Sequence, residues 1–132
     1  MDATFDFMIL GAGIDLVELA RIRKSLEEFG ERFLERILRP AEISYCVSHK
    51  DPAPFVAGRF AAKEAVAKAF GTGIGRELGW LDMEVCRKES GEPFLALHGE
   101  GLKLLAKRGG RKIHLSLSHT ATHATAVAIM ED

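Results

Sequence analysis

Residues 54–70, PFVAGRFAAKEAVAKAF, set the architecture of this chain, because they predict one long helix whose apolar stripe is typical of a buried element. Pro54 in its first turn and Gly71 directly after it are typical start and stop signals. The stripe carries four apolar side chains at spacings of four, seven and three residues: Val56, Phe60, Ala67 and Phe70. Lys63 lies on the same stripe, so its charge needs a partner if the stripe is buried.

Shorter elements precede and follow this helix. Alternation and periodicity predict strands over 5–13, 80–87, 94–97, 112–118 and 122–130, and helices over 16–29, 31–38, 42–49 and 98–108. Helices and antiparallel hairpins fall in separate blocks, which favours an α+β fold with antiparallel strands packed against the long central helix and the shorter helices. Because 132 residues contain no repeat or linker, we expect a single domain over residues 1–132.

The composition limits the function classes. Hydrophobic residues make up 47% of the chain and charged residues 28%, which is ordinary for a soluble globular protein. A net charge of −1 argues against nucleic-acid binding, and the lack of an apolar run of ~20 residues argues against a membrane span. Asp2 and Asp6 are unlike the start of a signal peptide, and Cys46 and Cys86 match no metal or redox spacing. We therefore expect a reduced, cytoplasmic protein.

Two carboxylates are candidate metal ligands. Asp15 follows the run MILGAGI at residues 8–14, and Glu64 lies beside the apolar stripe of the long helix. A hard cation such as Mg²⁺ takes one or two protein carboxylates and completes its shell with substrate phosphates and water. Each residue also has a purely structural interpretation that stays open: Asp15 as the N-cap of helix 16–29, and Glu64 as an i,i+4 partner of Lys68.

Cationic and glycine-rich positions near the long helix suggest anion binding. Arg59 and Lys63, one turn apart, can present two cations to a phosphate, although Lys63 can instead extend its ammonium to water. Residues 71–75 follow a helix rather than precede one, which favours a helix stop over a phosphate loop, while their backbone N–H groups remain able to assist an anion. His119, at a strand end beside Ser118, suits a polar cleft.

The first two predicted helices carry a local basic excess, made up of Arg21, Arg23, Lys24, Arg32, Arg36 and Arg39. Four glutamates dilute this excess. A solvated helix surface and a docking face for an acidic protein therefore both remain open.

Three blocks of sequence carry a family resemblance. They are GIDLVE at 13–18, GRFAAKEA at 58–65 continuing as KAFGTGIG at 68–75, and LSLSHT at 115–120. Their order and separation resemble the holo-[acyl-carrier-protein] synthase family, the small class of 4′-phosphopantetheinyl transferases, across almost the whole chain.

The resemblance implies an α+β enzyme that transfers the phosphopantetheine arm of coenzyme A to a serine of apo-acyl carrier protein and releases adenosine 3′,5′-bisphosphate, in support of fatty acid biosynthesis. It implies that Asp15 and Glu64 hold Mg²⁺ against the diphosphate of coenzyme A, with Glu64 and Lys63 as catalytic residues. The short members of the family are homotrimers with active sites between neighbouring subunits.

The resemblance also implies two binding surfaces. The coenzyme A site would include Arg59, Lys63, Gly71, Thr72, Gly73 and His119. The acidic recognition helix of the carrier protein would meet Arg21, Arg23 and Lys24.

Three other functions stay open at this stage. A coenzyme A or nucleotide-binding module would not need two carboxylates, a Mg²⁺-dependent phosphohydrolase of a small diphosphate would need no protein partner, and a structural oligomer subunit would leave Asp15 and Glu64 unexplained. The proton acceptor for the serine hydroxyl also stays open among Glu64, Glu18, Glu42 and a metal-bound water.

Overall fold

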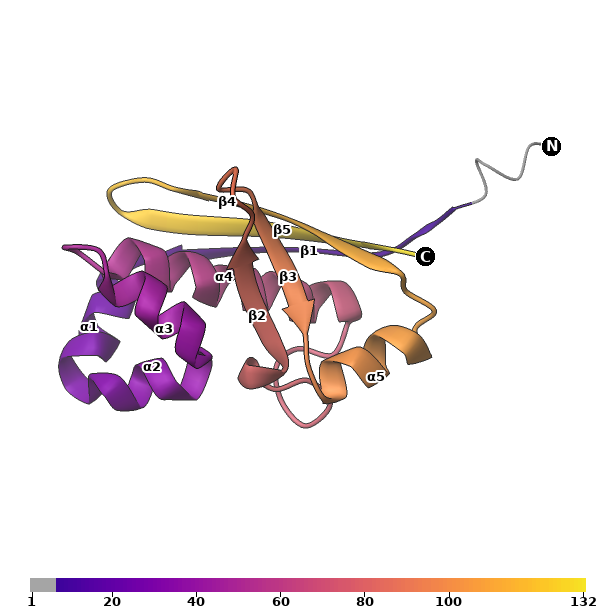
Figure 1. Ribbon diagram of the computed structural model, residues 1–132, viewed down its shortest axis with the longest axis horizontal. Helices are drawn as coiled ribbons and strands as arrows, with labels where there is room; N and C mark the ends of the chain where they lie inside the picture. Colours follow the sequence, from indigo (N-terminus) through magenta and orange to yellow (C-terminus); the bar gives the residue numbers. More distant parts are fainter. Residues whose placement is uncertain (1–6) are drawn as a thin grey trace.

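A computed structural model describes residues 7–132, in which a long helix packs on antiparallel strands (Figure 1). The elements are β1 (Ile9–Glu18), α1 (Leu19–Phe29), α2 (Glu31–Ile37), α3 (Pro40–Val47), α4 (Ala53–Phe70), the 3-10 helix η2 (Trp80–Asp82), β2 (Met83–Arg87), β3 (Pro93–Leu97), α5 (Glu100–Lys107), β4 (Lys112–His119) and β5 (His123–Glu131). The predicted α+β class is confirmed. Within this part of the chain no helix has the length and apolar character to cross a bilayer.

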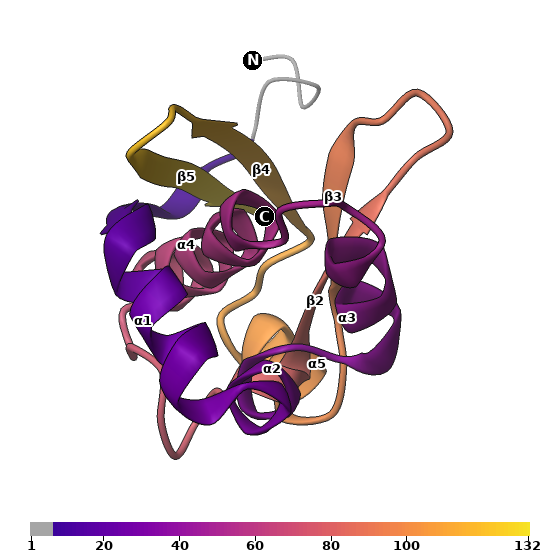
Figure 2. The ribbon, with the colours of Figure 1, turned by 90° about the vertical axis from the view of Figure 1, so that its left-hand side faces the viewer.

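The strands form two antiparallel sheets. One has the order β1-β5-β4, and the other is the hairpin of β2 and β3. Figure 2 shows α4 enclosed by the larger sheet, by α1 and α3, and by the β2–β3 hairpin. Because α4 has neighbours on every side, nearly all of its side chains are buried rather than one stripe alone.

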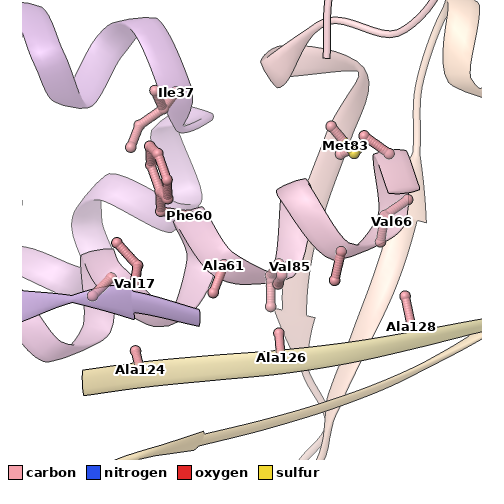
Figure 3. Close-up of a cluster of buried hydrophobic side chains, with 14 of the residues drawn as sticks. Val17, Ile37, Phe60, Ala61, Val66, Met83, Val85, Ala124, Ala126 and Ala128 are labelled. Carbon is pink, nitrogen blue, oxygen red and sulfur yellow. The ribbon is translucent and has the colours of Figure 1, made fainter. Parts of the chain in front are cut away.

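Small side chains let the larger sheet lie close to α4. Burial alternates along β5, and its buried positions are Ala124, Ala126, Ala128 and Met130. Figure 3 shows the β5 alanines pointing toward α4, which contributes Ala61 and Val66 to the same cluster. The core is therefore a helix–sheet layer in which short side chains permit a close approach.

Two glycines of β1 bring the strand against the backbone of α4. A Cβ on Gly13 would lie 1.9 Å from the carbonyl oxygen of Ala65, and one on Gly11 would lie 2.0 Å from that of Ala69. Such distances are impossible for any other residue without moving the strand. The glycines therefore decide how near the following residue on the same face, Asp15, comes to the helix.

The start of the chain differs from the prediction. The first strand runs from Ile9 to Glu18 instead of over 5–13. Residues 1–6, which include Asp2 and Asp6 and the first two residues of the predicted strand, lie outside the described residues. Helix α1 begins at Leu19, so the interpretation of Asp15 as its N-cap is wrong; Asp15 lies within β1, opposite Ala126. Pairing with β5 over the whole of β1 overrides the local helical periodicity of residues 16–18.

Other boundaries move through local interactions. Residues 80–82 form η2 rather than the beginning of a strand, and the Asp82 carboxylate accepts a hydrogen bond from the backbone N–H of Gly79 at 2.8 Å. Helix α3 begins two residues earlier than predicted, because Pro40 suits a first helical position. Helix α5 begins only after Gly99, whose φ is +50°.

The outer face of the larger sheet carries apolar side chains. Ile14 and Leu16 of β1 are each 65% exposed. Val127 of β5 lies directly opposite Ile14 and shares this face. This face is not covered by any element of residues 7–132 (Figure 1).

Candidate active site

The crossing of β1 and α4 brings the two predicted metal ligands together. Asp15 shares the inward face of β1 with Gly13 and Val17, and Thr125 Oγ1 holds its backbone by donating to the Asp15 carbonyl at 2.8 Å. Lys68 Nζ lies 3.0 Å from Asp15 Oδ1 and donates to the carbonyl of Ile14 at 2.9 Å. Lys68 thus turns toward β1, and the alternative pair of Glu64 with Lys68 is not formed.

The Glu64 carboxylate has no polar partner in the part of the chain that the structure describes. Among residues 7–132 it makes no side-chain hydrogen bond and no ion pair. Burial raises the pKa of Glu64, and the neighbouring Asp15 raises that pKa further, while Lys68 and Arg21 oppose the shift. Two carboxylates that repel each other, one of them unpaired, form a site in which a cation is favourable.

The donor set fits Mg²⁺ better than a transition metal. Among the described residues no group of three or more His, Cys, Asp or Glu side chains is placed to hold a metal ion. Mg²⁺ needs only one or two carboxylates when substrate phosphates and water supply the rest. Asp15 and Glu64 are hard oxygen donors of that kind.

A cavity of about 500 Å³ opens beside Glu64, between α1, α2, α4 and η2. We call it the arginine cavity, because its lining includes Arg21, Arg32 and Arg36 together with the aromatic rings of Phe60 and Trp80. The Arg21 guanidinium lies 5.5 Å from the centre of the Phe60 ring. Cations and aromatic surface therefore adjoin the unpaired carboxylate.

The other predicted docking residues are placed differently. Arg23 pairs with Asp51 at 2.8 Å on the exposed surface, and neither Arg23 nor Lys24 lines the arginine cavity. The sequence interpretation had included Arg32 and Arg36 in a general basic excess without separating them. Their helical spacing of four residues is the signal that places both on one face of α2.

The position of Lys63 differs from both of its predicted environments, water and a phosphate. It is buried, as its stripe predicted, but its ammonium reaches neither water nor an open cavity. Nζ lies 2.7 Å from Glu42 Oε1 and donates to the carbonyls of Ile37 and Trp80 at 2.7 and 3.2 Å. Burial lowers the pKa of Lys63, and Glu42 opposes that shift. The expectations that Lys63 snorkels to water or faces a phosphate disagree with this geometry, because all three N–H groups are occupied.

Arg59 lies in a different environment from Lys63. It is 3% exposed, its Nε is buried with no hydrogen-bond partner among residues 7–132, and its guanidinium lies 4.3 Å from the centre of the Tyr45 ring. Nη1 donates to the Phe55 carbonyl at 3.3 Å. A buried cation without a carboxylate partner is costly unless an anion completes it.

Arg59 and His119 line one cavity of about 260 Å³. We call it the Arg59 cavity; Ser118 and Arg87 also contribute to it. Sequence reasoning had brought Arg59 and His119 together through the resemblance, and had missed Arg87, which no local pattern distinguished. The Arg59 cavity and the arginine cavity share no lining residue.

The glycine-rich loop is a helix stop. Gly71 caps α4 with a φ of +79° and donates its N–H to the carbonyl of Lys68. The N–H groups of Thr72 and Gly73 both donate to the carbonyl of Ala67. The prediction of a helix stop is confirmed, whereas the idea that these N–H groups assist an anion disagrees with their intramolecular bonds. None of the three residues lines the two cavities described above.

Known proteins match this chain over nearly its whole length. The family model for the 4′-phosphopantetheinyl transferase superfamily matches residues 11–128. The chain belongs to this superfamily.

Individual relatives, known from curated sequences and from solved structures, agree with the match to this transferase superfamily. The holo-[acyl-carrier-protein] synthase of Koribacter versatilis is 50% identical over 125 residues, covering 95% of this chain and 100% of the relative. The crystal structure of holo-[acyl-carrier-protein] synthase from Neisseria meningitidis has a TM-score of 0.89 at 34% identity, covering 95% of this chain and 100% of that one. The Helicobacter pylori synthase in complex with coenzyme A has a TM-score of 0.81 at 38% identity, covering 90% and 98%.

Proposed function

We propose that this superfamily member transfers the 4′-phosphopantetheine arm of coenzyme A to a serine of apo-acyl carrier protein and releases adenosine 3′,5′-bisphosphate. The observation that carries the proposal is the Glu64 carboxylate, which has no polar partner among residues 7–132, neighbours Asp15 and lines the arginine cavity. The activity named for the relatives, and the coenzyme A bound to the Helicobacter pylori synthase, support it.

Asp15 and Glu64 are proposed to hold Mg²⁺, the cofactor of the reaction. When bound, the ion would neutralise charge on the diphosphate of coenzyme A and orient it for attack. Lys68 already lies against Asp15 and adds a cation on the same side of the site. Thr125 and the β1 glycines keep Asp15 in place, so the chain supplies a preformed ligand pair.

The serine hydroxyl must lose a proton as it attacks. Of the proposed acceptors within this chain, Glu42 is removed by its buried bonds to Lys63 and to the N–H of Val85. Glu18 lies exposed at the end of β1. Glu64 is the carboxylate that adjoins both the metal ligand Asp15 and the cavity, and we propose it as the acceptor.

The phosphates of coenzyme A are proposed to reach Arg59 and His119. The Nε of Arg59 provides a donor that has no acceptor among residues 7–132. Lys63 is not part of this proposed site, because its ammonium already donates to three acceptors within the protein. Residues 71–73 directly follow α4 and are proposed to contribute only surface near Lys68.

We propose a homotrimer whose active sites lie between subunits. Two observations support it. The sheet face around Ile14 and Leu16 is exposed and apolar, and the Arg59 cavity and the arginine cavity are separate within one chain. A neighbouring copy that covers the sheet face could bring its own Arg59 and His119 to the Asp15–Glu64 pair.

The arginine cavity is the proposed docking site for an acidic helix of the carrier protein, chiefly through Arg21, Arg32 and Arg36. We further propose a role in fatty acid biosynthesis. A cytoplasmic location agrees with the free thiols of Cys46 and Cys86.

Intact-protein mass spectrometry tests the function. Apo-acyl carrier protein would be incubated with this protein, coenzyme A and Mg²⁺, with a parallel sample in EDTA. The expected result is a gain of one phosphopantetheine that EDTA abolishes. No gain with carriers of several types, or cleavage of coenzyme A without transfer, would overturn the proposal in favour of a binding module or a phosphohydrolase.

A further inference from the structure

An ion pair is completely enclosed next to the proposed catalytic carboxylate. Lys63 and Glu42 are joined at 2.7 Å, and their side chains are 0% and 1% exposed. Lys63 immediately precedes Glu64 in α4. The proposed reaction makes no use of either residue, although removing two charges from water is costly.

The bonds of this pair converge from five elements. Lys63 of α4 donates to Glu42 of α3, to the carbonyl of Ile37 at the end of α2, and to the carbonyl of Trp80 in η2. Glu42 Oε2 accepts the backbone N–H of Val85 in β2 at 2.9 Å, and Oε1 accepts that of Arg39 at 2.9 Å. One pair therefore satisfies an otherwise orphaned carbonyl at a helix end and ties η2 to α2.

Two of the carbonyls that Lys63 holds belong to walls of the arginine cavity. Ile37 of α2 and Trp80 of η2 both line it, together with Phe60 of α4, and α2 and η2 contact each other. The Trp80 ring packs on Phe60 with centroids 5.0 Å apart, and Figure 3 shows Ile37 beside Phe60. A shift of either carbonyl would change the width of the cavity next to Glu64.

We propose that the Lys63–Glu42 pair is a positioning device that sets the shape of the arginine cavity for the carrier protein. The inference rests on the proposed function of that cavity as the docking site. Apolar packing of similar volume can match a buried ion pair in stability, but it is non-directional. Three directed N–H bonds from one ammonium fix where the Ile37 and Trp80 carbonyls lie, and that is the property a docking cavity needs. Lys63 is thus a positioning residue that touches no substrate.

Two variants separate positioning from stability. Lys63→Met leaves the Glu42 charge buried without its partner, so the midpoint of thermal unfolding is expected to fall. The double variant Lys63→Met with Glu42→Gln removes both charges at similar volume, and most of the lost stability is expected to return. The bonds to Ile37 and Trp80 remain absent in both variants. Val66→Ala, a buried change in α4 outside the cavity lining, serves as a control for destabilisation alone.

Steady-state kinetics and fluorescence provide the readouts. In the double variant we expect KM for the carrier protein to stay raised about tenfold, which corresponds to ~1.4 kcal/mol, while KM for coenzyme A changes less than about twofold. Trp80 is the single tryptophan of the chain, so acrylamide quenching of its emission reports the looseness of η2 without any activity measurement. Quenching is expected to increase in both Lys63 variants and not in Val66→Ala.

Three results would overturn the inference. Recovery of the carrier KM together with stability in the double variant would make the pair structural only. A rise in KM for coenzyme A without a change in KM for the carrier would indicate that Lys63 acts in binding the coenzyme A phosphates. Unchanged Trp80 quenching in both Lys63 variants would show that η2 does not depend on the pair. Failure of the native protein to modify any carrier would instead refute the proposed function, and the quenching comparison would still test the positioning.

Discussion

Lys63 and Glu64 are consecutive residues of α4, yet they meet opposite environments. Lys63 is enclosed and has an acceptor for each N–H, whereas Glu64 adjoins a cavity and has no polar partner among residues 7–132. Helical geometry turns neighbouring side chains about 100° apart, so one residue faces the α2–α3 interior and the next faces β1 and α1. A buried charge whose hydrogen bonds are all satisfied within the protein therefore has a structural role, whereas a charge without a protein partner beside a cavity is a candidate for ligand binding.

The largest expected effect is loss of turnover in Glu64→Gln. We expect turnover to fall about 10²- to 10³-fold, because the variant removes the proposed Mg²⁺ ligand and proton acceptor. Initial rates by mass spectrometry at saturating substrates measure the effect, and circular dichroism checks that the fold remains. Turnover within a factor of about three of the native value would contradict a catalytic role for Glu64, and Glu64 would then not differ from Lys63 in function.

A substitution at the β1–α4 crossing tests whether close approach creates the open site. Gly13→Ala places a Cβ 1.9 Å from the Ala65 carbonyl oxygen, so the strand must move. We expect a loss of ~1–3 kcal/mol in the free energy of unfolding, together with weaker Mg²⁺ binding because Asp15 is displaced. Gly75→Ala is the matched control, since its added Cβ meets nothing within 4 Å. Equal behaviour of the two variants in urea unfolding would contradict the close-approach argument.

Helix α1 offers the same contrast between an arginine at the cavity and one that is paired elsewhere. Arg21→Ala is expected to raise KM for the carrier protein about tenfold, which corresponds to ~1.4 kcal/mol. Arg23→Ala is expected to change it less than about twofold, because Arg23 is engaged with Asp51 and lies outside the cavity lining. The Arg21 effect should shrink as salt is raised. A larger effect of Arg23→Ala than of Arg21→Ala would indicate that the carrier protein docks on the other side of α1.

The smallest expected effect is a pH dependence of stability from Glu64. Its folded-state pKa lies above the ordinary value of 4.5, so the folded protein holds this proton more tightly than the unfolded chain does. The stability that Glu64 contributes is therefore present below pH 4.5 and is lost as pH rises through the folded pKa. Thermal unfolding without Mg²⁺ should show native protein losing stability relative to Glu64→Gln over that interval, and Mg²⁺ should raise the midpoint of the native protein only. The opposite slope would mean that Glu64 has an unrecognised cationic partner.

Local pattern predicted much of this molecule. The long helix, its buried stripe, the α+β class and the separate hairpins follow from periodicity and turn residues, which act over a few positions. The limits of β1 did not follow, because residues 16–18 have helical periodicity and become a strand only through pairing with β5. Likewise η2 depends on a capping bond from Gly79 to Asp82 that alternation alone does not reveal.

Local sequence was enough to single out three residues that we propose for the chemistry. Asp15, Glu64 and Arg59 are charges that stand beside glycines, alanines and aromatic residues. Which partner each charge has depends on the tertiary structure, because the partners come from distant parts of the chain. Lys63 finds Glu42 21 positions away and Lys68 finds Asp15 53 positions away. Whether a charge is paired or free depends on contacts between elements, and periodicity within one element contains no information about them.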